Sequence, residues 1–431
     1  MPPRRQPPSE LHRAVLHGSP ELTAAIIASG LINIDQGDPR GSTPLMYCSL
    51  KGYVPVARVL LDRGADVSLS DEDGFTALHV TAQNGHEGLS TLLLKAGASL
   101  EAATSDGSTP LHLCSQKGNL GVMRLLIEAG ADVDSQSSTG ATPLYLAAEE
   151  CQAAAIRELL RAKANPMLVA GDRFAPLDMS TQNGDAEAVR ALVGHAGIEG
   201  CGGDSGGSQA LRLAAEEQHI DIMRFLMAAG AADTGGEWGT VALNGAAEYG
   251  RERSTKLLLE QCARKPGVSV RAYVNSRDPL TVTPLLASIK GCRPGAARVA
   301  RMLIDAGADT AAAAPVLNSF GIPYFHGTPL AAAKALLSRK EVDGEPATEQ
   351  QLHSLQAIRR LLLRVSAVRA VSWLWAIDVP RIDDPRAAAE GAAPGEQAPS
   401  APLAPMLPTL RRRTGKRGVL VAGLFRYARK R

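Results

Sequence analysis

The sequence predicts an all-α fold built from stacked helix-turn-helix repeats that short β-hairpins connect. A Thr-x-Leu unit recurs every 33 residues, at Thr43, Thr76, Thr109 and Thr142. A fixed period of this length is typical of a repeat array, and its extent predicts about ten repeats. Hydrophobic residues make up 45% of the 431-residue chain, but aromatic residues only 4%. That balance favours closely packed helices over a β-sandwich or barrel.

Residues 107–139 show how one repeat is built. Thr109 can cap the start of a first helix, because its hydroxyl can accept a hydrogen bond from a free backbone N–H. That helix is expected to end near Gly118, since glycine readily takes the left-handed conformation that terminates helices. A second, amphipathic helix follows at about residues 120–129. Residues 131–140 are polar and rich in turn formers, which predicts a projecting hairpin.

This unit resembles the ankyrin repeat, because the Thr-Pro-Leu start, the internal glycines and the leucine pairs recur in phase. The resemblance implies two antiparallel helices and one β-hairpin finger per repeat, stacked into a curved solenoid. A single repeat cannot bury its own apolar face, so stability comes from stacking. The resemblance also implies that fingers and inner helices form a groove that binds other proteins. It implies that His12, His79 and His112 form hydrogen bonds within and between repeats. Equivalent residues of successive repeats lie about 10 Å apart, which is too far for them to share a zinc ion.

The array can be followed along the chain as it becomes less regular. The predicted order is a disordered N-terminus at 1–8, near-consensus repeats at 9–197, a Gly-rich loop at 198–207, divergent repeats with insertions at 208–366, a capping helix at 367–378, a disordered linker at 379–410 and a basic tail at 411–431.

Two pairs of residues interrupt the pattern. In the fifth repeat, Cys151 and Lys163 stand where neighbouring repeats have glycine. A non-glycine residue in the left-handed region costs about 1 kcal/mol, so we expect local irregularity there. Cys201 and Cys292 fall in predicted loops, where their thiols would be exposed.

Within the Gly-rich loop, the string Gly-Asp-Ser-Gly-Gly around Ser205 resembles the nucleophile loop of trypsin-like serine proteases. Such an enzyme also needs a histidine and a buried aspartate on a different fold, and neither has a matching context upstream. The sequence contains no Cys-x-x-Cys pair, which is the spacing that would suggest a metal or redox site. The sequence therefore predicts a protein without catalytic residues, cofactor or metal.

The predicted fingers carry the candidate binding residues. Acidic residues recur in successive hairpins, either because aspartate suits turns or because an acidic row steers a basic partner. Phe75 lies beside a finger turn, where an aromatic ring is expected to be mostly exposed and to anchor a partner. The finger residues predicted to contact a protein partner are Asp38, Arg40, Glu72, Asp73, Phe75, Asp106, Ser108 and Thr139.

The tail at 411–431 has nine Lys or Arg and no acidic residue, although the net charge of the chain is only +2. Its core is Arg411, Arg412, Arg413, Lys416 and Arg417. This core suits a nuclear-import signal, a contact with nucleic acid or anionic lipid, or a solvated end without a role. No secretory signal and no membrane-length apolar run is visible. The expected location is therefore intracellular, in the cytoplasm, the nucleus or both.

These features together predict a non-enzymatic scaffold or adaptor that binds a protein partner. Two alternatives remain open. The first is a nucleic-acid or membrane contact made by the basic tail. The second is a subunit that recruits substrates to an enzyme complex such as a ubiquitin ligase, although no recruitment box is recognisable.

Overall fold

The computed structural model describes residues 9–376, except 172, 202–206, 232–240, 278–281, 313, 318–322, 340 and 343–344. The chain divides into two units, Met1–Arg360 and Leu361–Arg431. Of the second unit, the structure describes only the C-terminal part of one helix. The predicted segments 1–8, 379–410 and 411–431 lie outside the described residues, and so do Ser205 and the five basic residues of the tail core.

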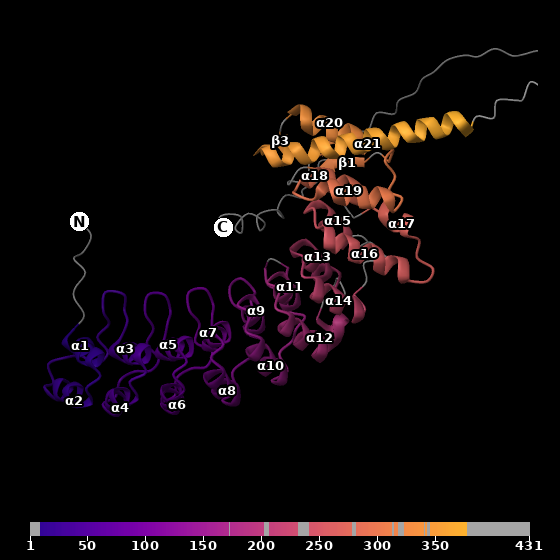
Figure 1. Cartoon of the computed structure of the whole chain (residues 1–431). Coiled ribbons are helices and arrows are strands. Elements are labelled where there is room, and N and C mark those ends of the chain that lie inside the picture. The colour runs from indigo at the N-terminus through magenta and orange to yellow at the C-terminus, as the bar shows by residue number, and fades with distance from the viewer. Residues whose placement is uncertain are drawn as a thin grey trace, which may run out of the picture. The chain divides into compact units, whose positions relative to one another are not determined.

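The first unit consists of successive helix pairs that form two rows (Figure 1). The first helices of the pairs are called the inner helices here, and the second helices are called the outer helices. The inner helices are α1 (Glu10–His17), α3 (Pro44–Lys51), α5 (Ala77–Asn84), α7 (Pro110–Lys117), α9 (Pro143–Glu149), α11 (Pro176–Gln182), α13 (Ser208–Glu217), α15 (Val241–Glu248), α18 (Pro284–Gly291) and α20 (Pro329–Arg339). The outer helices are α2 (Pro20–Ala28), α4 (Val54–Asp62), α6 (Glu87–Lys95), α8 (Leu120–Glu128), α10 (Ala153–Arg161), α12 (Ala186–Cys201), α14 (Ile220–Ala228), α16 (Glu252–Arg264) and α19 (Ala296–Asp305).

The rows are continuous because each inner helix contacts the next inner helix, from α1 to α20, and each outer helix contacts the next outer helix, from α2 to α19. The leucine of each Thr-x-Leu unit is central to this packing. Leu45, Leu78, Leu111 and Leu144 are all at most 1% exposed. Burying one leucine stabilises a fold by about 1.5–3 kcal/mol, which explains why this position repeats. The all-α repeat solenoid predicted from the sequence is confirmed.

Polar side chains also join the repeats. Asn119, which follows the glycine that ends α7, donates through Nδ2 to the main-chain oxygen of Ala82 at 2.8 Å. His219 makes the equivalent contact with the oxygen of Gln182 at 3.2 Å. Both contacts satisfy a carbonyl in the last turn of an inner helix, where the carbonyls lack partners within the helix. In both cases a side chain of one repeat caps the inner helix of the preceding repeat.

The fifth repeat is more regular than its sequence suggests. Cys151 (φ 57°) and Lys163 (φ 68°) take the left-handed conformation that glycine takes in the neighbouring repeats. Helices α9 and α10 consequently keep their contacts with the repeats on both sides. The expected irregularity of the backbone is therefore wrong. The chain instead bears a conformational strain of about 1 kcal/mol at Cys151 and at Lys163.

The predicted exposure of two cysteines is also wrong. Cys201 is the last residue of α12, and Cys292 directly follows α18, yet both are 0% exposed. Residues 198–201, which we expected in the Gly-rich loop, are helical after a break at Gly197 (φ 72°, ψ 170°). The loop at 202–206 lies outside the described residues.

The divergent repeats carry their insertions as small elements of secondary structure. Helix α17 (Val270–Asn275) lies in one long connection. Two antiparallel hairpins lie in others, formed by β1 (Ala314–Leu317) with β2 (Pro323–Gly327) and by β3 (Glu341–Val342) with β4 (Glu345–Pro346). Helix α21 (Glu349–Ala376) is continuous, so the predicted second helix of the last repeat and most of the segment at 367–378 form one helix.

Candidate functional site

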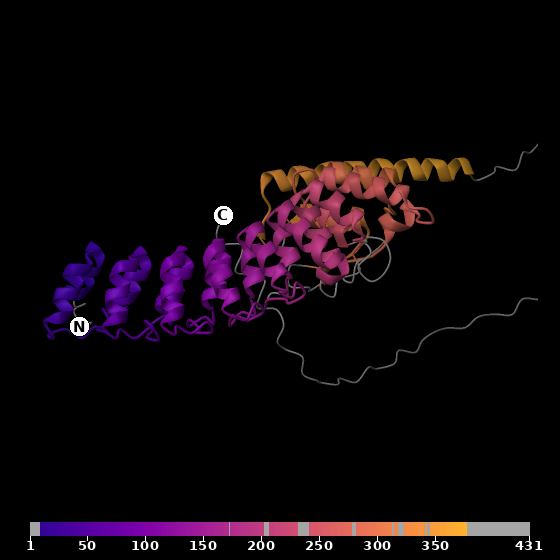
Figure 2. The ribbon, with the colours of Figure 1, turned by 90° about the horizontal axis from the view of Figure 1, so that it is seen from below.

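The fingers are tight loops that project beside the inner helices. Figure 2 shows them as a row along one edge of the first helix pairs, from indigo to magenta. Each is closed by a main-chain hydrogen bond across five residues, such as Asp71 N–H to the Phe75 oxygen at 3.0 Å and Thr104 N–H to the Ser108 oxygen at 3.0 Å. Among the described fingers of the first repeats, the isolated bridge between Ser70 and Thr76 is the extent of β-pairing.

Neighbouring fingers are hydrogen-bonded to one another through the main chain. Glu72 N–H donates to the Arg40 oxygen at 2.9 Å, and Ser105 N–H donates to the Asp73 oxygen at 2.8 Å. The same bond recurs at the next two fingers, where Ser138 and Gly171 donate at 2.8 and 2.7 Å. Five fingers are therefore linked into one ladder, which fixes their spacing and presents their tips as a single surface.

The tips hold the charged residues that the sequence singled out. Arg40 and Asp73 lie on adjacent fingers and form an ion pair, with Nη2 and Oδ2 2.6 Å apart. Their side chains remain 69% and 52% exposed, so the pair is accessible to a partner. Glu72 and Thr139 are also exposed. The ion pair means that the acidic row is partly neutralised at its N-terminal end.

Asp38 is turned toward its own repeat. Its carboxylate accepts hydrogen bonds from the backbone of Arg40 at 2.8 Å, the backbone of Ser42 at 2.9 Å and the hydroxyl of Tyr47 at 2.9 Å. Partial burial raises the pKa of Asp38, but these hydrogen bonds outweigh it and hold the pKa below its ordinary value. Asp38 therefore stays ionised and connects a finger to the inner helix α3.

Asp106 is exposed, but its carboxylate is likewise hydrogen-bonded within its own finger. It accepts hydrogen bonds from the hydroxyl of Thr104 and from the backbone and hydroxyl of Ser108, the latter two at 3.2 Å. The Thr104 bond contributes most to lowering the pKa of Asp106. Ser108 itself is only 6% exposed. Its predicted contact with a partner is therefore not supported, and Ser108 instead shapes the finger that carries Asp106.

Phe75 is not the exposed anchor that we expected. Its side chain is half-buried, and its ring packs against His79 with the two ring centres 5.8 Å apart. Phe75 is therefore partly covered by its own repeat.

Several acidic residues of the fingers accept hydrogen bonds from backbone N–H groups. The carboxylates of Asp35, Glu101 and Asp134 each accept a backbone N–H from the residue 31 positions later, at 3.0, 2.9 and 2.8 Å. Asp71 likewise accepts the N–H groups of Asp73 and Phe75. Of the two explanations for the acidic row, turn chemistry accounts for Asp71. Asp35, Glu101 and Asp134 instead join neighbouring repeats.

The buried histidines tie fingers to inner helices. The N–H of Thr76 donates to Nδ1 of His79 at 3.1 Å, which places the ring proton on Nε2. Nε2 then donates to the main-chain oxygen of Ser108 at 3.1 Å, in the next finger. His112 repeats the arrangement one repeat later. Burial lowers the pKa of both rings. This effect is larger than the increase in pKa caused by the hydrogen bond from Nε2 to the carbonyl.

The inner helices present a second set of residues that the sequence reasoning missed. The fourth residue of α1, α3, α5, α7 and α9 is Arg13, Tyr47, Val80, Leu113 and Leu146, respectively. One turn later, Leu16 and Leu50 are 37% and 48% exposed. The 33-residue period could have revealed them, because residues at equivalent positions of a repeat array lie on the same face.

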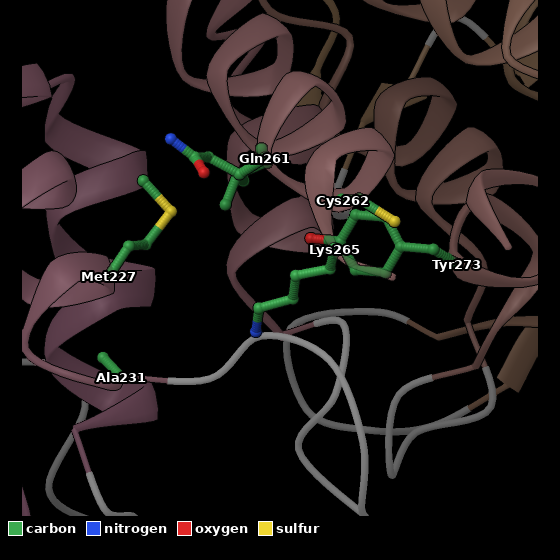
Figure 3. Close-up of a pocket in the computed structure, with 7 residues that line it drawn as sticks. Met227, Ala231, Gln261, Cys262, Lys265 and Tyr273 are labelled. Carbon is green, nitrogen blue, oxygen red and sulfur yellow. The ribbon is translucent and has the colours of Figure 1, made fainter. Parts of the chain in front are cut away.

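A small cavity lies elsewhere in the first unit. Its lining comes from α14, with Met227 and the adjacent Ala231, and from α16 and α17, with Cys262 and Tyr273, while the Lys265 side chain extends between them (Figure 3). Its volume is about 60 Å³. None of the residues predicted to bind a partner lines this cavity, so it is separate from the fingers.

The described part of the chain offers little for other chemistry. No group of three His, Cys, Asp or Glu side chains there could hold a metal ion. Burial raises the pKa of Cys48, Cys114 and Cys201 to about 12, which keeps these thiols protonated. No described helix combines the length and apolar character that crossing a membrane requires.

Comparison with known proteins points to one family. A family model described as ankyrin repeats in three copies matches residues 11–104, 99–170 and 144–236, which together span more than half of the chain. Inversin from Gallus gallus is 41% identical over 63 residues, covering 15% of this chain and 6% of that protein. Ankyrin repeat domain-containing protein 13B from Mus musculus and from Homo sapiens is 42% identical over 57 residues, covering 13% of this chain and 9% of each relative. The chain thus aligns with less than a tenth of these relatives.

Proposed function

Because the chain belongs to the ankyrin repeat family, we propose that it is a non-enzymatic scaffold or adaptor that binds another protein through its fingers and inner helices. Ankyrin repeats are protein-protein interaction modules, and a stacked array offers an extended surface for this purpose. The observation that carries the proposal is the ladder of main-chain hydrogen bonds between fingers. It orders the tips before a partner arrives, which lowers the entropic cost of binding.

The finger residues proposed to make the contact are those with exposed side chains. Arg40, Glu72 and Asp73 lie on two adjacent fingers, and Asp106 and Thr139 extend the surface along the next two. Asp38 and Phe75 are proposed to contribute through their accessible edges. Arginine and aromatic side chains are enriched among the residues that dominate binding energy, so Arg40 is the first candidate.

Affinity capture from a cell lysate with mass spectrometry tests this function. One bait is the full chain, and a second carries Arg40→Ala, Glu72→Ala and Asp73→Ala. These three side chains are exposed, and the finger ladder uses only their main chain, so the fold should persist. A matched control carries Arg58→Ala, Asp62→Ala and Glu128→Ala on outer helices, which removes the same charges from exposed positions.

We expect a protein that the wild type and the control capture but the finger variant loses. A further full-length bait replaces Arg411, Arg412, Arg413, Lys416 and Arg417 with Gln. Capture that survives the finger changes but disappears with this bait would move the function to the tail. Loss of capture in the outer-helix control would contradict a binding surface on the fingers.

A further inference from the structure

The inner helices α1, α3 and α5 carry an apolar stripe. On α3, Tyr47 and Leu50 lie three residues apart and therefore on the same helical face. Leu16 occupies the position of Leu50 on α1, and Val80 occupies the position of Tyr47 on α5. These side chains lie on helices that contact one another, and Arg13 on α1 and Gln83 on α5 interrupt the stripe at the remaining positions. Leu16 at 37% and Leu50 at 48% exposure are incompletely covered within the described chain.

Positive charge borders this stripe on the side away from the fingers. Lys51 follows Leu50 in the last turn of α3, and Lys117 occupies the equivalent position on α7. Both are exposed, and neither forms an ion pair with any residue the structure describes. In α1, α3, α5 and α7 the sequence has no acidic residue after Glu10. At the same position α1 has His17 and α5 has Asn84. The helix ends therefore carry two exposed lysines and no acidic residue over four repeats.

The border with the two lysines ends at the fifth inner helix. Glu149 and Glu150 stand at the end of α9, and Gln116 of α7 donates to Glu150 at 3.4 Å. On the opposite border, the finger tips carry Glu72 and Asp106. The apolar stripe thus lies between an acidic border at the fingers and a border with two exposed lysines at the helix ends.

Helix electrostatics explain only part of this pattern. A lysine in the last turn is stabilised by the negative end of the helix dipole, so its sign alone is unremarkable. The dipole does not account for exposed leucines beside it, because an exposed apolar side chain gains nothing from that field. Apolar side chains bordered by charge are the usual composition of a protein-binding surface.

We infer that this inner face binds a partner segment that carries apolar side chains along one side and carboxylates next to them. The apolar side chains pack on Leu16, Tyr47 and Leu50, and the carboxylates face Lys51 and Lys117. Two helix spacings of 8–10 Å separate these lysines, so the carboxylates are roughly 20 Å apart along the segment. The inference rests on the proposed function and specifies the partner. Basic groups of that partner face the finger tips.

The test uses a displayed library of random 16-residue peptides selected on the immobilised full chain. We expect the enriched peptides to combine leucine, isoleucine or phenylalanine with aspartate or glutamate. Changing both Lys51→Glu and Lys117→Glu should weaken the best peptide about tenfold or more, since each attraction becomes a repulsion. Selection repeated on this variant should yield basic peptides. The outer-helix variant with Arg58→Glu and Lys95→Glu should bind like the wild type.

A second variant tests the apolar part of the proposed contact. Changing Leu16→Ser and Leu50→Ser should weaken the same peptide without altering its charge preference, and thermal unfolding checks that each variant folds. A library without enriched binders, binders without acidic residues, or binding that the lysine reversal leaves intact would overturn the inference. Protein capture that depends on the fingers but not on these lysines would leave the proposed function standing while the inference fails.

Discussion

At the scale of single residues, His79 and His112 make the stability of this chain depend on pH. In each, Nδ1 accepts a backbone N–H and Nε2 donates to a carbonyl, so the neutral ring satisfies both neighbours. Protonation would place a hydrogen on Nδ1 opposite a donor. Burial adds the desolvation cost of the charged ring, and the pKa of both residues is therefore lowered from the ordinary value of 6.5.

The sign of the pH effect follows from linkage. The unfolded chain binds protons at a higher pKa than the folded chain, so lowering the pH favours unfolding. The stabilising contribution is complete above about pH 6.5 and is lost as the pH falls through the lowered folded-state pKa. We expect the Tm to be lower at pH 5.0 than at pH 7.5.

The measurement is thermal unfolding followed by circular dichroism across this range. In a variant with His79→Gln and His112→Gln, the Tm should change less between the two pH values. Nearby Asp71, Asp106 and Glu101 oppose the shift in the wild type, so the paired comparison isolates the imidazoles. An equal pH dependence in both proteins would show that these rings are not the source.

At the scale of elements, the fingers act as one unit because their main chains approach closely. A Cβ at Gly107 would lie 2.8 Å from the backbone nitrogen of Ser138 in the next finger. That nitrogen donates to the Asp106 oxygen, which belongs to the ladder. Gly130 also has a positive φ, of 94°, but a Cβ there would have nothing within 4 Å.

These two glycines allow a matched comparison. Gly130→Ala should cost about 1 kcal/mol, the penalty of a left-handed alanine. Gly107→Ala should cost about 2–3 kcal/mol, because it adds the clash and the loss of a main-chain hydrogen bond. Urea unfolding measures both. Equal losses in the free energy of unfolding would indicate that each finger adjusts independently and that the ladder does not couple them.

The elements also show what could be predicted from the sequence. Helix pairs, caps and the buried leucines followed from the 33-residue period, because each is set locally. The half-burial of Phe75 and the burial of Ser108 did not, because each depends on how a finger folds back onto a helix or onto its neighbour. The acidic side chains were visible in the sequence, but the backbone groups that they accept lie 31 residues away in the chain.

At the scale of the whole molecule, the repeats persist beyond the region where their sequence is regular. Inner helices α13, α15 and α18 remain in contact although the Thr-Pro-Leu start is absent from the first two. A small residue lets two of these helices approach closely, since a Cβ at Gly291 in α18 would clash with the main-chain oxygen of Glu248 in α15. Such close approach is a tertiary property, and a single sequence does not reveal which helix will be the neighbour. The contact residues of the partner site remain predictions for the same reason.

Hydrogen exchange on the full chain, with and without its captured partner, tests the central claim most directly. The account predicts new protection in the fingers at 38–42, 71–75 and 104–108 and in the exposed ends of α1, α3, α5 and α7. Exchange in the outer helices α2, α4, α6 and α8 should remain unchanged. Protection confined to the outer helices or to residues 411–431, with none in the fingers, would contradict the account.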